Sequence, residues 1–190
     1  MTWFSRTMRL LYALACLALS SHQLFSQTTV GSNGRPSPAD STMARLGGTW
    51  RLVATRQRMT DGTVRPDPDL GSNPSGYLMF DAVAGQMCTV VNNGDRARWA
   101  DAAHPTDAEA RAIWAQTVSY CATWSVDSTG RELVYRLGAN MSPNLIGAER
   151  RRRFTLEGDR LILYPTPLPA GVSEWTVEWR RASAGLRAAR

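Results

Sequence analysis

Four consecutive arginines begin at Arg150, in the stretch RRRRFTLE, and they are the residues of this sequence best suited to bind an anion. Neighbouring positions of a β-strand point to opposite faces, so Arg150 and Arg152 share a face with Phe154 and Leu156. If this apolar face lies inward, a buried Arg152 requires an acidic partner or an anionic ligand, because an unpaired buried charge is costly. We therefore consider Arg152 a candidate anchor for a carboxylate, with an internal salt bridge or a solvated rim as alternatives.

Groups for acid-base or nucleophilic catalysis are sparse. His104 precedes Pro105 in a loop-like stretch, and the sequence has no Gly-x-Ser-x-Gly motif. Proton transfer would fall to Tyr135, Asp81 or Glu149, and their spacing singles out none of them. Catalytic residues are therefore unknown. With two histidines in the whole chain, we expect neither a metal site nor a cofactor.

Cys88 and Cys121 are the cysteines outside the N-terminal region, where Cys16 lies. In an oxidising compartment the two could form a disulfide, and two unpaired buried thiols are the alternative. Strand alternation points both side chains away from a cavity.

Short strand-like runs separated by turn signals fill most of the chain. Dipeptides that favour tight turns, such as Asp61-Gly62 and Asn93-Gly94, lie between them. The expected strands are 49–56, 76–81, 86–92, 119–127, 132–137, 148–156, 160–164 and 174–180. About eight antiparallel strands at this spacing indicate a meander that closes into a barrel or folds into a sandwich.

One helix is expected within 106–118, TDAEARAIWAQTV. Thr106 and Glu109 form a capping-box pattern, and Ile113 and Trp114 are available for burial. The Pro-rich stretch 65–76 is expected to be an ordered loop between the first two strands.

Two glycines, Gly47 and Gly48, lie just before Trp50 in the stretch LGGTWRLVAT, 46–55, with only Thr49 between. In a small barrel the first strand enters beneath the closed end, where glycine lets backbone and aromatic rings approach closely. The last strand, SEWTVEWRR, brings Arg180 and Arg181 to the place where the ends of a closed meander meet. Because an Arg stacked on an indole gains roughly 0.5–2 kcal/mol, we predict that Trp50 and Arg180 form a structural lock.

The Gly-x-Trp near the start and the Arg in the final strand resemble the lipocalins and their calycin relatives. In chain order, the pieces LGGTWRLV, NPSGYLMF, GQM, YCATWSVD, SPNLIG, RRFTLEGDRLIL and WRR resemble more specifically the bacterial and fungal lipocalin-like domain family. The resemblance covers 46–180. It implies an all-β fold, an antiparallel up-and-down lipocalin-like β-barrel of about eight strands with one helix inserted between strands, around an apolar cavity.

The resemblance also frames the functional hypotheses. Most members of that family carry no established activity, and some resemble cyclising or isomerising enzymes. Where the family's strand before the Pro-Asn pair is expected to hold a histidine, this chain has Tyr135 nearest, which argues against chemistry through that imidazole. The main hypothesis is an exported protein that binds a small apolar or amphipathic, optionally acidic, ligand. The alternatives are a cofactor-independent cyclase or isomerase using the same cavity, and a filled-core structural module.

Strand alternation selects the lining of such a cavity. The residues predicted to bind the ligand are Tyr77, Met79, Met87, Tyr120, Trp124, Tyr135, Arg152 and Phe154. A filled core made of the same side chains is the alternative, because a barrel of about eight strands is the size at which both outcomes occur.

The N-terminal region has the layout of a secretory signal peptide. Arg6 and Arg9 precede the apolar run LLYALACLAL, 10–19, which is too short to span a bilayer. The expected organisation is a signal peptide at 1–26, a flexible linker at 27–45, the barrel domain at 46–181 and a disordered tail at 182–190. A lipoprotein anchor at Cys16 is the alternative. We expect a secreted or periplasmic protein with no stable membrane anchor after cleavage.

The net charge of +6 is the excess of 22 basic over 16 acidic residues, and all of the basic residues are arginine. Removal of the leader lowers the excess, and an arginine-only composition indicates a codon bias rather than an adaptation to phosphate. Nucleic acid is therefore not an expected partner. The expected partner is a small hydrophobic or amphipathic molecule.

Overall fold

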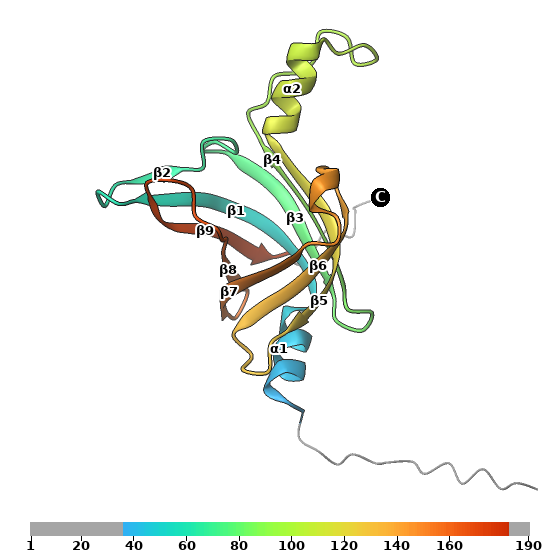
Figure 1. Cartoon of the computed structure of the whole chain (residues 1–190), viewed down its shortest axis with the longest axis vertical. Helices are drawn as coiled ribbons and strands as arrows, with labels where there is room; N and C mark the ends of the chain where they lie inside the picture. Colours follow the sequence, from blue (N-terminus) through green and yellow to red (C-terminus); the bar gives the residue numbers. More distant parts are fainter. Residues whose placement is uncertain (1–35, 183–190) are drawn as a thin grey trace, which may run out of the picture. The chain divides into compact units, whose positions relative to one another are not determined.

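The computed structural model describes residues 36–182, in which eight strands of a nine-stranded antiparallel sheet close into a barrel (Figure 1). The barrel strands are β1 (Gly48–Met59), β3 (Pro74–Asp81), β4 (Gln86–Asn93), β5 (Thr117–Val126), β6 (Glu132–Asn140), β7 (Glu149–Glu157), β8 (Arg160–Tyr164) and β9 (Val172–Arg181). The barrel closes because β1 pairs with both β3 and β9. The predicted all-β up-and-down barrel and its eight strands are confirmed.

The ninth strand, β2 (Val64–Pro66), was not predicted. It pairs with the far half of β1, where Arg56 faces Pro66, while β3 pairs with the first half of β1. The loop predicted at 65–76 overlaps this strand, because two prolines, Pro66 and Pro68, follow Arg65. Pro66 is compatible with this position because β2 lies at the edge of the sheet, where one side of the strand needs no ladder partner.

Helix α1 (Pro38–Leu46) occupies the last part of the predicted flexible linker, so that prediction is wrong for 38–45. Ser37 caps the helix, and Asp40 completes a capping box by accepting hydrogen bonds from the Ser37 backbone N–H and hydroxyl. Leu46 then buries its side chain fully in the barrel core. The predicted leader at 1–26, the start of the linker up to residue 35, and residues 183–190 of the predicted tail lie outside the described residues.

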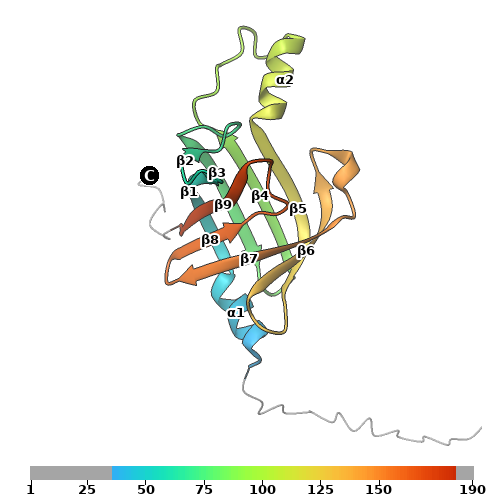
Figure 2. The ribbon, with the colours of Figure 1, turned by 60° about the vertical axis from the view of Figure 1, so that its left-hand side comes forward.

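Helix α2 (Asp107–Ala115) lies between β4 and β5 as predicted, with Thr106 and Glu109 forming the capping box. Its expected burial is wrong, because no residue of the helix is buried and Trp114 is 54% exposed. The helix extends beyond one end of the barrel, and α1 lies at the other end (Figures 1 and 2). Within residues 36–182, no helix is long and apolar enough to cross a bilayer.

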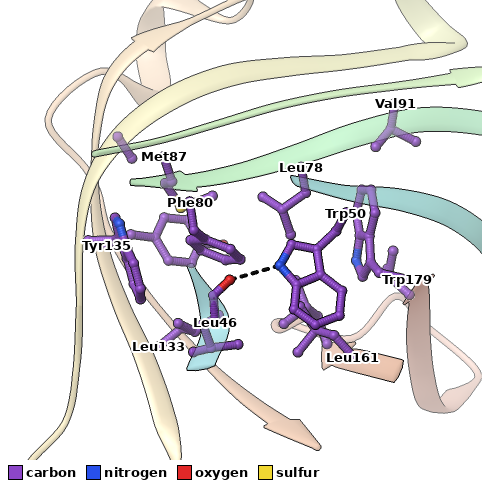
Figure 3. Close-up of a cluster of buried hydrophobic side chains, with 14 of the residues drawn as sticks. Leu46, Trp50, Leu78, Phe80, Met87, Val91, Leu133, Tyr135, Leu161 and Trp179 are labelled. Atoms are coloured by element: carbon purple, nitrogen blue, oxygen red, sulfur yellow. Dashed lines mark hydrogen bonds between the residues drawn. The ribbon is translucent and has the colours of Figure 1, made fainter. Parts of the chain in front are cut away.

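The α1 end of the barrel is closed by Trp50, whose side chain is 0% exposed (Figure 3). Its indole Nε1 donates a hydrogen bond to the Leu46 carbonyl at 2.8 Å. The cation over its ring belongs to Arg181 and not to the predicted Arg180. In the antiparallel register Trp50 faces Arg181, while Arg180 faces Arg51 on the outer surface of the barrel.

Both glycines before Trp50 are explained by close approaches at this end. Gly48 has φ +113°, and a Cβ there would lie 3.2 Å from Nη1 of Arg181. A Cβ at Gly47 would lie 3.2 Å from the Cβ of Ala82. The rest of this half is a filled core, in which the rings of Phe80 and Trp124 lie 4.5 Å apart between centroids.

A disulfide joins Cys88 of β4 to Cys121 of β5. The two residues face each other directly in the register of these strands. The bond therefore ties together the two strands that flank the connection carrying α2. Of the two alternatives left open by the sequence, the structure has the bridged one.

Candidate functional site

Two adjoining cavities occupy the half of the barrel next to α2. The first, which we call the mouth cavity, has a volume of about 280 Å³ and is lined by Trp114, Tyr135 and Leu145 among others. The second, the inner cavity, has a volume of about 130 Å³ and is lined mainly by apolar side chains such as Leu78 and Leu163. Three residues line both cavities: Val118, Tyr120 and Arg152. These residues therefore mark the junction between the two spaces.

Strands β5, β6 and β7 position the aromatic and basic groups of this junction. In the β6–β7 register, Tyr135 faces Arg150 and Leu133 faces Arg152, so the two arginines share the inner face with buried residues of β6. The rings of Tyr120 and Tyr135 are stacked, with centroids 5.9 Å apart and planes inclined by 4°. The Cζ atom of Arg152 lies over the Tyr135 ring, 5.8 Å from its centroid.

Arg152 is a cation without an acidic partner in this structure. Among residues 36–182 it forms no ion pair, and its Nε is buried without a hydrogen-bond partner. The linings of the mouth and inner cavities contain no Asp or Glu. By contrast, Arg151 on the outer face pairs with Glu149 at 3.2 Å and with Glu132 at 4.0 Å. Of the three alternatives for Arg152, the internal salt bridge is therefore not formed.

The phenol of Tyr135, which lines the mouth cavity, is a second polar group beside the junction. Its hydroxyl is buried without a hydrogen-bond partner among the described residues. Burial raises the pKa of Tyr135, and the neighbouring Tyr120 phenol raises it further. The group therefore stays protonated around neutral pH, so it can donate a hydrogen bond but does not act as a base. Within the described part of the chain, no cluster of three or more His, Cys, Asp or Glu side chains could hold a metal ion.

Three of the predicted ligand-binding residues, Tyr120, Tyr135 and Arg152, come together at the cavities. The prediction is wrong for Tyr77 and Met79, whose side chains are 53% and 50% exposed on the outer face of β3. The inner face of β3 carries Leu78 and Phe80 instead. Because YLMF is apolar at every position, the alternation gave no signal for which pair faces inward.

The other three predicted residues line neither cavity. Met87 and Trp124 point inward, but they are buried in the filled core of the closed half. The Trp124 indole Nε1 donates to the Asp81 carbonyl at 3.1 Å. Phe154 packs against the same core and is half-buried. These residues belong to the same hydrophobic core as inner-cavity residues such as Leu78 and Leu163.

Thr55, Trp175 and Trp179 are among the inner-cavity residues that sequence reasoning missed. Before the bulge between Leu52 and Ala54, the even-numbered residues of β1 face inward. The bulge shifts this alternation by one residue, so that the odd-numbered Thr55 faces inward. No sequence signal marks that bulge. Trp175, Val177 and Trp179 occupy every second position of the last strand, and this period-2 pattern of apolar residues is a usable signal for its inner face.

Comparison with known proteins identifies a family and similar solved structures. The profile of a family described as "Lipocalin-like domain" matches residues 47–182. The crystal structure of a lipocalin-like protein from Bacteroides uniformis ATCC 8492 is similar, with 13% sequence identity and a TM-score of 0.39 over 73% of this chain and 99% of that chain. No curated protein matches the sequence.

Proposed function

We propose that this chain, which belongs to the lipocalin-like domain family, is an exported protein that binds a small amphipathic acid in the half of its barrel next to α2. One observation carries the proposal: Arg152 lies at the junction of two mainly apolar cavities, and its buried Nε has no hydrogen-bond partner among residues 36–182. A guanidinium in such a place gains most from a carboxylate, which accepts charge-assisted hydrogen bonds. Apolar walls around it suit the hydrocarbon part of the same molecule.

The dimensions of the site favour a small ligand. The mouth cavity, about 280 Å³, is slightly smaller than the roughly 300 Å³ at which pockets for drug-sized molecules begin. The inner cavity adds space beyond the junction residues. A filled-core module would leave neither space, so the binding hypothesis is preferred over that alternative.

The enzyme alternative has less support from the residues of the site. A cofactor-independent cyclase or isomerase uses a group that gives or takes a proton near neutral pH. The raised pKa of Tyr135 removes it as a base, and a guanidinium offers hydrogen-bond donors but no acceptor. Binding without turnover is therefore the simpler function for this cavity.

Export is part of the proposal. The basic and apolar N-terminal run has the layout of a signal peptide. A structural disulfide such as that between Cys88 and Cys121 is typical of secreted and periplasmic proteins. Detection of the protein in periplasmic or culture-medium fractions of its host, with its N-terminus sequenced, tests this part.

The test of binding compares an acid with its neutral isostere. Isothermal titration with 3-phenylpropanoate and 3-phenylpropanamide keeps the size and shape of the ligand nearly constant and changes its charge. We expect the acid to bind at least about tenfold more tightly, because hydrogen bonds to charged groups contribute roughly 1.5–3 kcal/mol. Equal affinity for the two compounds, or no binding of either, contradicts the proposal.

A matched pair of variants assigns the preference to one side chain. Arg152→Gln removes the guanidinium at the junction of the two cavities, leaves Arg150 of the mouth cavity in place, and should abolish the preference for the acid. Arg151→Gln changes the neighbouring arginine, which lies on the outer face in contact with Glu149 and Glu132, and should preserve it.

A further inference from the structure

We infer that the acid bound by this barrel carries a neutral hydrogen-bond acceptor, such as a carbonyl oxygen, at the end remote from its carboxylate. The inference rests on the proposed function and adds a second recognition point to it. That point is the wall of the inner cavity formed by three side chains, Thr55, Trp175 and Trp179.

Each of these side chains has a buried polar atom without a partner. Thr55 Oγ1, Trp175 Nε1 and Trp179 Nε1 form no hydrogen bond within residues 36–182. Thr55 faces Val177 in the β1–β9 register, and Val177 lies between the two tryptophans on the inner face of β9. The three groups therefore belong to one wall. Buried polar atoms are rarely left unpaired, and three on one cavity wall call for an explanation.

The same barrel shows how its other buried polar groups are treated. At the closed end, the indole N–H groups of Trp50 and Trp124 donate to the carbonyls of Leu46 and Asp81. In the inner cavity itself, the hydroxyl of Thr89 donates to the Tyr77 carbonyl at 3.1 Å. The buried side-chain donors without a partner among residues 36–182 therefore all lie at the two cavities. Three of them share this wall, and the other two are the Tyr135 hydroxyl and Arg152 Nε.

The chemistry of the unpaired atoms defines the complementary group. An indole N–H donates and does not accept, and a threonine hydroxyl can also donate. A neutral oxygen acceptor satisfies these donors at no electrostatic cost. A second carboxylate would place a charge beside neutral donors only, which is costly away from solvent. Arg152 borders the same inner cavity, so one molecule can place its carboxylate there and its acceptor against this wall.

The experiment uses two acids that differ only at the remote end. In 3-(4-acetylphenyl)propanoate the para substituent carries a carbonyl, and in 3-(4-isopropylphenyl)propanoate a methyl group replaces that oxygen. Both keep the carboxylate. Isothermal titration of each acid is carried out with the full mature chain and with two variants. Thr55→Val keeps the shape and removes the hydroxyl, and Trp175→Phe keeps an aromatic ring and removes the N–H.

We expect Thr55→Val, Trp175→Phe or both to weaken the acetyl acid by about fivefold and to leave the isopropyl acid within about twofold. Thr89→Val is the matched control, because its hydroxyl is already engaged with the Tyr77 carbonyl. That variant should change the two affinities equally. Circular dichroism and thermal melting of each variant exclude misfolding as the cause of a lost affinity.

The outcomes separate this inference from the proposed function. Both acids can bind through Arg152 while each donor variant changes their affinities equally. In that case the three donors do not recognise the acceptor, and the inference is overturned while the acid site stands. The same result is expected if solvent pairs these donors in the complex. If neither acid binds, or if Arg152→Gln leaves both affinities unchanged, the proposed function itself fails.

Discussion

The Cζ atom of Arg181 lies 4.2 Å from the centre of the Trp50 ring, and the same guanidinium connects segments from both ends of the barrel domain. Its Nη1 donates to the Gly47 carbonyl at 2.8 Å, its Nη2 donates to the Arg45 carbonyl at 2.6 Å, and its Nε donates to Asp159 at 3.1 Å. Arg181 thus stacks on the first strand while pairing carbonyl groups at the end of α1. Arg181 therefore joins the start and the end of the barrel domain at the closed end.

Replacement of Arg181 by Ala should lower the free energy of unfolding by about 2 kcal/mol, because a cation–π contact and hydrogen bonds to backbone carbonyls are lost together. Urea denaturation followed by tryptophan fluorescence measures the change. Arg180→Ala is the control, since Arg180 is exposed on the outer face and should change stability by less than about 0.5 kcal/mol. Equal losses in the two variants would contradict the assignment.

The lock illustrates what the sequence could and could not predict. The meander follows from turn spacing, and the pairing of Trp50 with an arginine of the last strand follows from residue types. Turn spacing left a barrel and a sandwich open, and the resemblance to the lipocalin-like family implied the barrel. Choosing Arg181 over Arg180 requires the register, because a shift of one residue moves a side chain to the opposite face.

The same limit applies to the site. The alternation of Arg152 with Phe154 was informative because charged and apolar positions differ, and Arg152 was placed correctly. At Tyr77 and Met79 both faces are apolar, and at Thr55 a bulge reverses the pattern, so periodicity alone could not assign them. Unpaired donors are visible only once the chain is folded.

The disulfide between Cys88 and Cys121 should stabilise the barrel. It links positions separated by 33 residues. Closing a loop of this size lowers the entropy of the unfolded chain and thereby raises the free energy of unfolding by about 2–4 kcal/mol. The double variant Cys88→Ala/Cys121→Ala should lose stability of that order in urea denaturation. Addition of a reductant should destabilise the wild-type protein and leave the double variant unchanged. An unchanged wild type under reducing conditions would show that the bridge contributes little.

Acid denaturation should depend on Asp127, in the turn between β5 and β6. A hydrogen bond from the Thr129 hydroxyl and bonds from backbone N–H groups lower the pKa of Asp127 from 3.8 to about 2. Because the folded pKa lies below the unfolded one, the carboxylate stabilises the fold fully above about pH 4, and this contribution is lost as the pH falls towards 2.

Asp127→Asn should therefore flatten the dependence of unfolding free energy on pH between about pH 4 and 2, relative to wild type. Urea titrations at several pH values in this window measure the slope. Asp69→Asn is the control, because Asp69 is exposed and its carboxylate forms no ion pair within residues 36–182. A slope unchanged by Asp127→Asn would show that the turn contributes nothing to acid stability.

Trp114 should contribute to binding more than to folding. It is 54% exposed on α2 and lines the mouth cavity. Trp114→Ala should change the unfolding free energy by less than about 0.5 kcal/mol, and it should weaken the binding of 3-phenylpropanoate about threefold through lost apolar contact. Trp99→Ala serves as control, because Trp99 is also exposed and lines neither cavity. A larger loss of affinity in the control would contradict the role of Trp114.

Arg152 should stabilise the complex at the expense of the free protein. Its buried Nε has no partner, so the free protein bears a desolvation cost that a ligand carboxylate would offset. Arg152→Met keeps much of the side-chain volume and removes this cost, so thermal melting should show a free protein at least as stable as wild type while the preference for the acid over the amide disappears. A gain in stability coupled to a loss of binding is typical of residues selected for function.

Arg151→Met, which breaks contacts with Glu149 and Glu132, should instead lower stability slightly and leave binding unchanged. A loss above about 1 kcal/mol in Arg152→Met would mean that the guanidinium supports the fold itself, and its proposed role as the ligand anchor would fall with that result.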